Sequence, residues 1–166
     1  MILKEKILFS KEECESIISY NETHITNWLM GDRKYDSQPI EYSSETKWLF
    51  DKLKDFVERE TNIEIRRIKK TIHFHKFVKD DWFAKHNDIK ENRLYAVGVL
   101  LNDNFEGGDF TLYNPNEIIL NKIIGNTYIF DVRIDHEIKP ILEGERYSLL
   151  WFLQNEHIKI ETNKLI

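Results

Sequence analysis

Two histidines and one aspartate, His86, Asp88 and His136, are the residues of this sequence best placed to bind a metal ion. His86 and Asp88 are two residues apart, and in an extended segment residues i and i+2 face the same side. Their imidazole and carboxylate can therefore point at one ion. His136 follows about fifty residues later. On a barrel, two histidines and one carboxylate form the facial triad of non-haem Fe(II) oxygenases, which leaves coordination positions open.

A second pair of polar residues, Arg146 and Ser148, lies in the apolar segment ERYSLLWFL, ten residues after His136. If this segment is a strand, both side chains share one face and Tyr147 points the other way. An arginine inside a small barrel requires an anionic partner, and its planar fork suits a carboxylate. The pair predicts a keto acid that chelates the metal and extends its far carboxylate to Arg146. The alternative is an ordinary salt bridge at the mouth of the barrel.

The second part of the chain supplies the strands that must position these residues. It contains short segments rich in Ile, Val, Phe and Tyr, and turn pairs such as Gly107-Gly108 and Asn114-Pro115 separate them. Short strands at this spacing predict a jelly roll or double-stranded β-helix over residues 63–160. The expected strands are 63–78, 93–102, 109–113, 117–120, 126–131, 134–138, 145–153 and 156–160.

The first 62 residues predict supporting helices. After a short apolar strand, Ser10 and Glu13 form a capping-box pattern that opens a helix through about Tyr20. Apolar residues at helical spacing predict a second helix over 44–61. We expect a long polar loop at 21–43, which could act as a lid. Residues 1–166 are therefore expected to form a single α+β domain.

Composition limits the classes of partner. The formal net charge is -5, and no apolar run approaches the roughly 18 residues that span a bilayer. The one cysteine, Cys14, cannot form an intramolecular disulfide, and its place near a helix start favours packing over nucleophilic chemistry. We expect a cytoplasmic protein with no nucleic-acid or membrane partner. The sequence makes no prediction of the oligomeric state.

Several segments, in order, resemble one family. FVKDDWFAKHND is similar to the aromatic-rich approach to a His-x-Asp pair, and RLYAVGVLLNDNFEGGDFTLYNP is similar to a strand, Asn-Asp and Gly-Gly stretch. NKIIGNTYIFDVRIDHEIKPILEGERYSLLWF follows the same order of Gly, Phe, His, Pro, Gly, Arg-x-Ser and Trp. Over roughly residues 68–153 the sequence resembles the 2-oxoglutarate- and Fe(II)-dependent oxygenases, specifically the prolyl 4-hydroxylase-like branch.

The resemblance implies a role for each of the five residues. His86, Asp88 and His136 would bind Fe(II) and carry the catalysis, while Arg146 and Ser148 would bind the C5 carboxylate of the co-substrate 2-oxoglutarate. It also implies dioxygen as a second co-substrate, with ascorbate as a candidate reductant. The expected reaction is hydroxylation of an unactivated C–H bond.

The substrate is expected to be a prolyl residue in a peptide or protein. Alternatives are a free amino acid such as proline, another small molecule, or a non-catalytic cupin-like module that binds a small acid. A module that only binds has no need for all four of His86, Asp88, His136 and Arg146. An oxygenase of nucleic-acid bases is disfavoured by the net acidity and the lack of a strong basic and aromatic surface.

Two further residues, Arg93 and Trp151, occupy positions that in relatives lie toward the substrate. The alternatives are that Arg93 is a surface charge and that Trp151 packs in the barrel. The sequence also departs from the family pattern, because relatives often have tyrosines where this chain has Phe77 and Leu100. The missing hydroxyls leave co-substrate binding incomplete, and a nearby His75 or Tyr95 could replace them.

Overall fold

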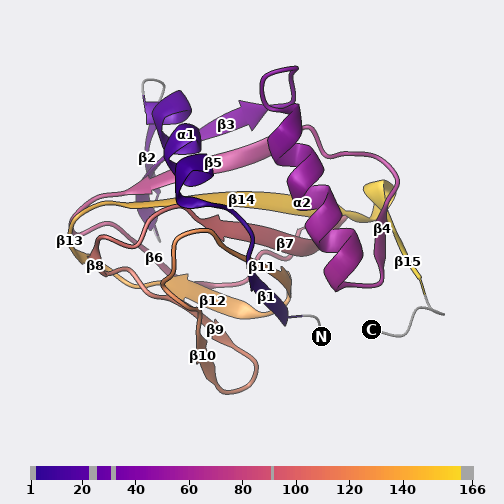
Figure 1. Ribbon diagram of the computed structural model, residues 1–166. Coiled ribbons are helices and arrows are strands. Elements are labelled where there is room, and N and C mark those ends of the chain that lie inside the picture. Colours follow the sequence, from indigo (N-terminus) through magenta and orange to yellow (C-terminus); the bar gives the residue numbers. More distant parts are fainter. Residues whose placement is uncertain (1–2, 23–25, 31–32, 91, 162–166) are drawn as a thin grey trace.

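The computed structural model describes residues 3–22, 26–30, 33–90 and 92–161. Two helices, α1 (Lys11–Asn21) and α2 (Lys47–Glu60), lie on one side of a large antiparallel sheet (Figure 1). The predicted capping box of α1 is confirmed, since Ser10 Oγ accepts from the Glu13 amide at 3.1 Å and Glu13 accepts from the Ser10 amide at 2.9 Å. None of the described helices is both long enough and apolar enough to span a membrane.

The main sheet has eleven strands, and its neighbouring strands run antiparallel. They follow the order β1-β11-β7-β14-β5-β3-β6-β12-β9-β10, and β2 pairs with β3. The strands of this sheet are β1 (Leu3–Ile7), β2 (Thr26–Met30), β3 (Arg33–Glu41), β5 (Thr71–Phe77), β6 (Trp82–His86), β7 (Arg93–Leu100), β9 (Phe110–Tyr113), β10 (Glu117–Ile119), β11 (Asn126–Asp131), β12 (Asp135–Ile138) and β14 (Arg146–Gln154). Two small sheets pair β13 (Ile141–Glu143) with β8 (Glu106–Gly107) and β15 (Ile158–Ile160) with β4 (Ile63–Ile65); a 3-10 helix, Asn155–His157, precedes β15.

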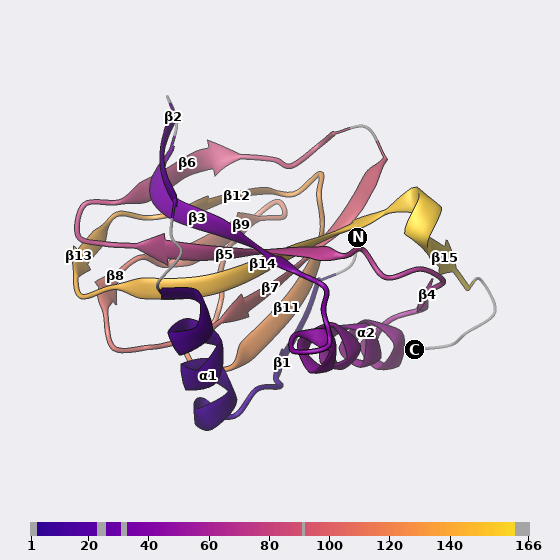
Figure 2. The same ribbon diagram turned by 90° about the horizontal axis from the view of Figure 1, so that it is seen from above.

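The sheet folds over itself into two facing halves. Seen from above, α1 and α2 lie on one side of β5, β14, β7 and β11, and the strands β6, β12 and β9 lie on the other (Figure 2). Two apolar clusters fill the spaces between these layers. One lies between helices and sheet and includes Leu53, Leu149 and Trp151, and the other fills the barrel interior and includes Phe130 and Phe152. Residues of β14 alternate between the clusters, so the barrel interior receives every second side chain of this strand.

The prediction of a long loop at 21–43 is wrong for the residues that the structure describes; 23–25 and 31–32 lie outside them. The strands β2 and β3 pair antiparallel, and β3 also pairs with β5 over 36–41 and with β6 at 33–34. The segment does not look like a strand because its buried positions include polar residues such as Gln38, whose amide donates to Asn21 Oδ1 at 2.8 Å and to Asn21 O at 2.9 Å. Pro39 is tolerated because its stretch of β3 pairs only with β5.

The other strand predictions differ in detail. Segment 63–78 divides into β4 and β5, and β6 lies outside the expected strands.

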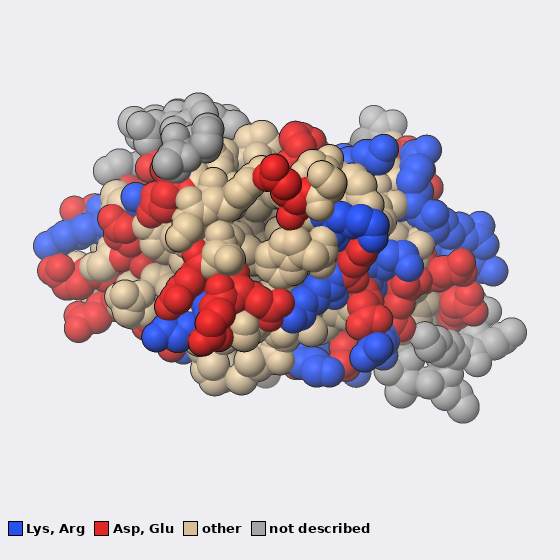
Figure 3. Space-filling model, turned by 45° about the horizontal axis from the view of Figure 1, so that its top comes forward, with Lys and Arg blue, Asp and Glu red and all other residues tan. Residues whose placement is uncertain are grey.

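Charged side chains of both signs are interspersed on the face shown in Figure 3, so neither sign covers that face alone.

Candidate metal centre

The two histidines of the predicted set face each other across neighbouring strands. His86 ends β6, and its register partner on β12 is His136. Asp88 lies just after β6, where its amide donates to Val132 O at 3.0 Å. One ligand atom from each of His86, Asp88 and His136 lies within 4.8 Å of the other two. The fold therefore brings together the three residues that the sequence singles out.

Both imidazoles have a fixed tautomer. Nδ1 of His86 lies 2.6 Å from Ala84 O, and Nδ1 of His136 lies 2.9 Å from Ile134 O. A carbonyl only accepts, so each Nδ1 donates, and a neutral ring then carries its lone pair on Nε2. Backbone partners of this kind orient metal-binding histidines in proteins.

The Nε2 atoms point at the Asp88 carboxylate. Nε2 of His136 lies 3.1 Å from Asp88 Oδ2, and Nε2 of His86 lies 3.6 Å from Oδ1. With both rings neutral, these atoms are all acceptors, and acceptors so close together need a proton or a cation between them. One divalent ion would satisfy all three residues at once. The donor set thus fits a metal of the kind that takes imidazole and carboxylate ligands.

The charge of Asp88 supports this fit. Burial opposes ionisation, but when the Nε2 atoms of His136 and His86 carry protons, their hydrogen bonds and charge hold the pKa of the Asp88 carboxyl well below its ordinary value, as a cation in the same place would. The group is therefore a carboxylate at neutral pH, as a ligand must be.

Aromatic rings enclose the two histidines. Phe83 stacks on His86 at 3.6 Å between ring centroids, while Phe110 and Phe130 lie 5.4 Å and 4.9 Å from the His136 ring. These contacts restrict the imidazole rotamers and lower the local dielectric, which strengthens electrostatic interactions inside the site.

Arg146 lies in the barrel interior and not at its mouth, so the alternative of a salt bridge at the barrel mouth is wrong. The side chain is 2% exposed; its Nε donates to Gly108 O at 3.1 Å, and Nη1 donates to Ser148 Oγ at 3.0 Å. Burial lowers the pKa of the guanidinium. Within the described residues, no carboxylate forms an ion pair with it. A buried cation whose hydrogen-bond partners are neutral is suited to an anionic ligand.

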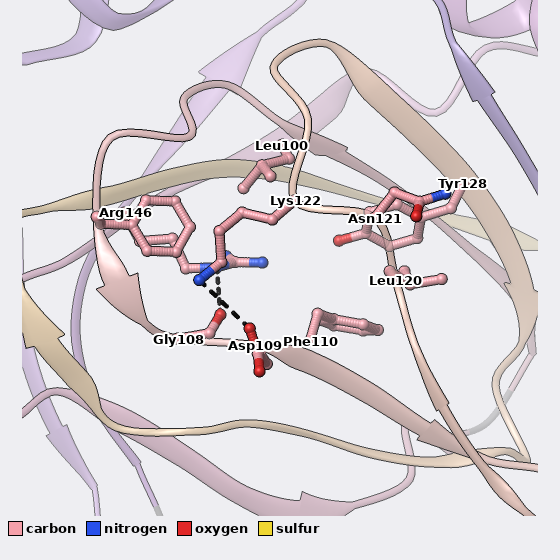
Figure 4. A pocket seen from close by; sticks show the side chains of 10 residues that line it. Leu100, Gly108, Asp109, Phe110, Leu120, Asn121, Lys122, Tyr128 and Arg146 are labelled. Carbon is pink, nitrogen blue, oxygen red and sulfur yellow. Dashed lines mark hydrogen bonds and ion pairs between the residues drawn. The ribbon is translucent and has the colours of Figure 1, made fainter.

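Tyr128, which the sequence pattern does not single out, joins the Arg146 pocket to the metal cavity. It lines both cavities and is 3% exposed. Its phenol and the Arg146 guanidinium point toward each other (Figure 4). Burial raises the pKa of Tyr128 and the guanidinium opposes that rise, so the phenol stays protonated at neutral pH. The signal that could reveal Tyr128 is the alternation of Asn126, Tyr128 and Phe130 along one strand face.

The structure places the two suggested replacements for the missing tyrosines differently. His75 is buried and lines the cavity beside the triad. Tyr95 packs against the cluster between sheet and helices, away from this cavity. Tyr128 thus brings a hydroxyl to the Arg146 pocket, which Leu100 also lines and where the Phe77 ring contacts the guanidinium.

Beyond the triad an outer cleft of about 370 Å³ opens, and Arg93 lines it together with Phe152 and His73. The suggested substrate-side position of Trp151 is wrong. Trp151 is fully buried in the cluster between sheet and helices, where its indole Nε1 donates to Lys69 O at 2.9 Å. Along β14 it lies an odd number of residues from Ser148, so it faces the opposite side of the sheet.

Solved structures share this architecture. A Pseudomonas putida prolyl-4-hydroxylase is 15% identical, with a TM-score of 0.74, and the match covers 92% of each chain. A Trichoplax adhaerens prolyl hydroxylase in complex with a hypoxia inducible factor peptide fragment is 18% identical, with a TM-score of 0.75, and the match covers 93% of this chain and 84% of that one. The viral collagen prolyl hydroxylase of Paramecium Bursaria Chlorella virus-1, in its 2OG complex, is 14% identical, with a TM-score of 0.72 and coverage of 92% and 95%.

No family model matches the sequence, and no curated protein matches it. The structural similarities confirm the predicted double-stranded β-helix with supporting N-terminal helices, which is the fold of prolyl hydroxylases and 2OG-Fe(II) oxygenases.

Proposed function

We propose that the chain is a single-domain dioxygenase that uses Fe(II) and 2-oxoglutarate to hydroxylate an unactivated C–H bond. One observation carries the proposal: a cluster of three side chains that could hold a metal ion, of which His136 is buried and His86 and Asp88 are partly buried, shares a barrel with a buried arginine that has no carboxylate partner among the described residues. A metal site alone, or a buried arginine alone, would be compatible with a different activity. Together they match a metal and a dianionic co-substrate.

In this proposal His86, Asp88 and His136 would hold the iron. Bound there, iron and 2-oxoglutarate together supply the oxidising chemistry, which consumes dioxygen and releases succinate and CO2. The residues of the chain fix the orientation of the metal-binding side chains and limit access to them. The backbone carbonyls at positions 84 and 134 orient the two imidazoles, and the Phe83 and Phe110 rings restrict the access of water.

Arg146, Ser148 and Tyr128 would bind the distal carboxylate of 2-oxoglutarate. The guanidinium would contribute charge and two-pronged donation. Ser148 Oγ accepts a hydrogen bond from Arg146, and Tyr128 lines the Arg146 pocket and the neighbouring cavity that Ser148 also lines. The cavity beside the triad measures about 30 Å³, so binding requires side chains to move. Phe110 and Tyr128 line both spaces, so we expect these two side chains to shift.

For the substrate we propose a prolyl residue in a peptide or protein. The support is the similarity to prolyl hydroxylases, one of which is in complex with a peptide fragment. The alternative is a free amino acid or another small molecule, which the outer cleft of about 370 Å³ could also admit. The enzyme would work in the cytoplasm, where the single cysteine, Cys14, needs no disulfide partner. Ascorbate is the proposed reductant, by similarity to the oxygenase family.

The test is turnover of 2-oxoglutarate with a panel of prolyl peptides and free amino acids. Protein, Fe(II), ascorbate and air are combined, succinate is quantified, and products are examined for a mass gain of one oxygen. We expect succinate with wild type and none above background with Asp88→Ala. The matched control is Asp103→Ala, which removes an exposed carboxylate. If wild type produces no succinate above a metal-free control, the non-catalytic module is favoured instead.

A further inference from the structure

The charges that line the outer cleft are mostly basic. Lys90 and Arg93 contribute cations, and His73 and His75 contribute imidazoles. Among the described lining residues, Asp88 is the one carboxylate. Asp88 also belongs to the proposed metal site, so its charge is shared with the metal. The cleft beyond the triad therefore has cations without anions of its own.

Arg93 is the most constrained of these cations. It begins β7, is half-buried, and its guanidinium carbon lies 3.7 Å from the centroid of the Phe152 ring. Stacking on an aromatic face leaves the in-plane N–H donors of a guanidinium available at its edges. In the described part of the chain, these donors form no side-chain hydrogen bond and no ion pair. Burial lowers the pKa of Arg93, and the Asp88 charge opposes that change.

The charge balance changes when the proposed metal and co-substrate are bound. The two positive charges of Fe(II) and the charge of Arg146 balance the Asp88 carboxylate and the two carboxylates of 2-oxoglutarate. Asp88 is then no longer available to Arg93. A partly buried guanidinium left without a counter-charge has an electrostatic cost that an anionic substrate would remove.

His73, which also lines the outer cleft, is suited to the same anionic substrate. Burial, and then Arg93, lower the pKa of His73, so its imidazole is neutral at pH 7. A neutral imidazole beside Arg93 can donate a hydrogen bond to an anion without adding a second charge.

We propose, on the basis of the proposed function, that the substrate carries a carboxylate that Arg93 binds through two N–H donors. The carboxylate would anchor one end of the substrate over Phe152 while the C–H bond faces the triad. Such a group can be the α-carboxylate of a free amino acid or an acidic side chain next to the target residue in a peptide. Both sources present the same planar anion to the guanidinium.

The experiment titrates matched pairs of compounds into the Mn(II)- and 2-oxoglutarate-loaded protein by calorimetry. One pair is L-proline and L-prolinamide, and the other consists of prolyl peptides that differ only in an Asp or an Asn beside the proline. In at least one pair, we expect the carboxylate member to bind about tenfold or more tightly than its amide. Preference in the first pair identifies a free amino acid, and preference in the second identifies an acidic peptide.

The variants are Arg93→Gln, Arg93→Lys and, as matched control, Arg66→Gln, which removes an exposed arginine on the surface. Arg93→Gln should abolish the preference for the carboxylate, Arg93→Lys should retain part of it, and Arg66→Gln should retain all of it. The dissociation constant for 2-oxoglutarate should be unchanged in all three. Should Arg93→Gln fail to fold, Arg93→Lys against Arg66→Gln remains the test.

The inference is overturned if wild type binds the amides as tightly as the carboxylates, or binds neither member of any pair. It is overturned as well if the Arg93 variants keep the full preference. Equal loss of carboxylate and amide binding in Arg93→Gln also overturns it, because that loss reports a structural role. Failure of the proposed function is distinguishable, since it appears as wild type that does not bind 2-oxoglutarate. In that case the same pairs are titrated into the Mn(II) protein alone.

Discussion

The ring of Tyr128 lies directly against the backbone of Gly98, its register partner on the neighbouring strand β7. A Cβ at position 98 would lie 2.3 Å from two carbons of the Tyr128 ring and 2.4 Å from its hydroxyl oxygen. The absence of a side chain at Gly98 is what allows the phenol to extend toward Arg146. This pair therefore determines whether the barrel interior has a hydroxyl beside the guanidinium.

Gly98→Ala should displace the Tyr128 ring. Overpacking of this kind costs about 1–3 kcal/mol of the free energy of unfolding, and affinity for 2-oxoglutarate should fall with it. Denaturant unfolding and calorimetry measure the two effects. In a Tyr128→Leu background, which removes the ring atoms that clash, the added methyl should cost much less. An equal cost in both backgrounds would contradict the steric explanation.

Tyr128→Phe should weaken 2-oxoglutarate binding by about tenfold or more, because a hydrogen bond to a charged group contributes about 1.5–3 kcal/mol. Affinity for Mn(II) should not change, since Tyr128 is not one of the three metal-binding side chains. Tyr95→Phe is the matched control, a partly buried phenol packed against the other cluster. If the two variants bind the co-substrate equally well, Tyr128 has no role in its binding.

Arg146→Ala should weaken 2-oxoglutarate binding by two or more orders of magnitude, about 3 kcal/mol or above, because it removes two charge-assisted donors. Arg146→Lys keeps the charge but loses the forked guanidinium, so its affinity for 2-oxoglutarate should lie between those of wild type and Arg146→Ala. Metal affinity should be nearly intact in both. Calorimetric titration of 2-oxoglutarate into the Mn(II)-loaded proteins measures this. Equal affinities in wild type and Arg146→Ala would remove the proposed role of this residue.

Asp88→Ala and His136→Ala should each lose most of their bound metal. Loss of a metal ligand should lower metal affinity by more than the roughly 10- to 100-fold that is typical when only a hydrogen-bond partner of a ligand is removed. Metal content after dialysis, measured by atomic spectroscopy, checks this against wild type and Asp103→Ala. Unchanged stoichiometry in both ligand variants would exclude the proposed metal site.

Cys14 should resist alkylation in the native protein. Burial, with a smaller contribution from Glu13, raises the pKa of the thiol to about 12. The reactive thiolate is therefore scarce at pH 8, whereas unfolding restores the ordinary pKa and exposes the group. Iodoacetamide labelling followed by mass spectrometry, with and without denaturant, gives the comparison. Rapid labelling of the native protein would show that this part of the core opens readily.

Much of the site can be predicted because it depends on strand alternation. His86 and Asp88 are two residues apart, and so are Arg146 and Ser148. The first pair converges just past the end of β6, and the second pair shares a face of β14, as expected. The same rule, applied from Ser148, excludes Trp151 from the barrel interior. The expectation for Trp151 fails because it transfers a family position without regard to this alternation.

Other features depend on contacts that spacing does not reveal. Tyr128 reaches Arg146 through the cross-strand register of β11, β7 and β14, and no sequence pattern fixes that register. The strand β3 escapes prediction because its buried Gln38 is satisfied by Asn21, a partner 17 residues away. Polar residues that find such partners do not follow the apolar patterns from which strands are predicted.

The pairing of β6 has a consequence for amide hydrogen exchange. Its register with β12 is interrupted by an irregularity between the His136 and Ile138 pairs, and among the described residues its pairing with β3 involves only Arg33 and Lys34. Few backbone pairs therefore hold the strand that ends in His86, and such strands open at low free-energy cost. A metal bound by His86 and His136 would join β6 to β12 and protect the amides of β6 from exchange, while those of β14 would change little.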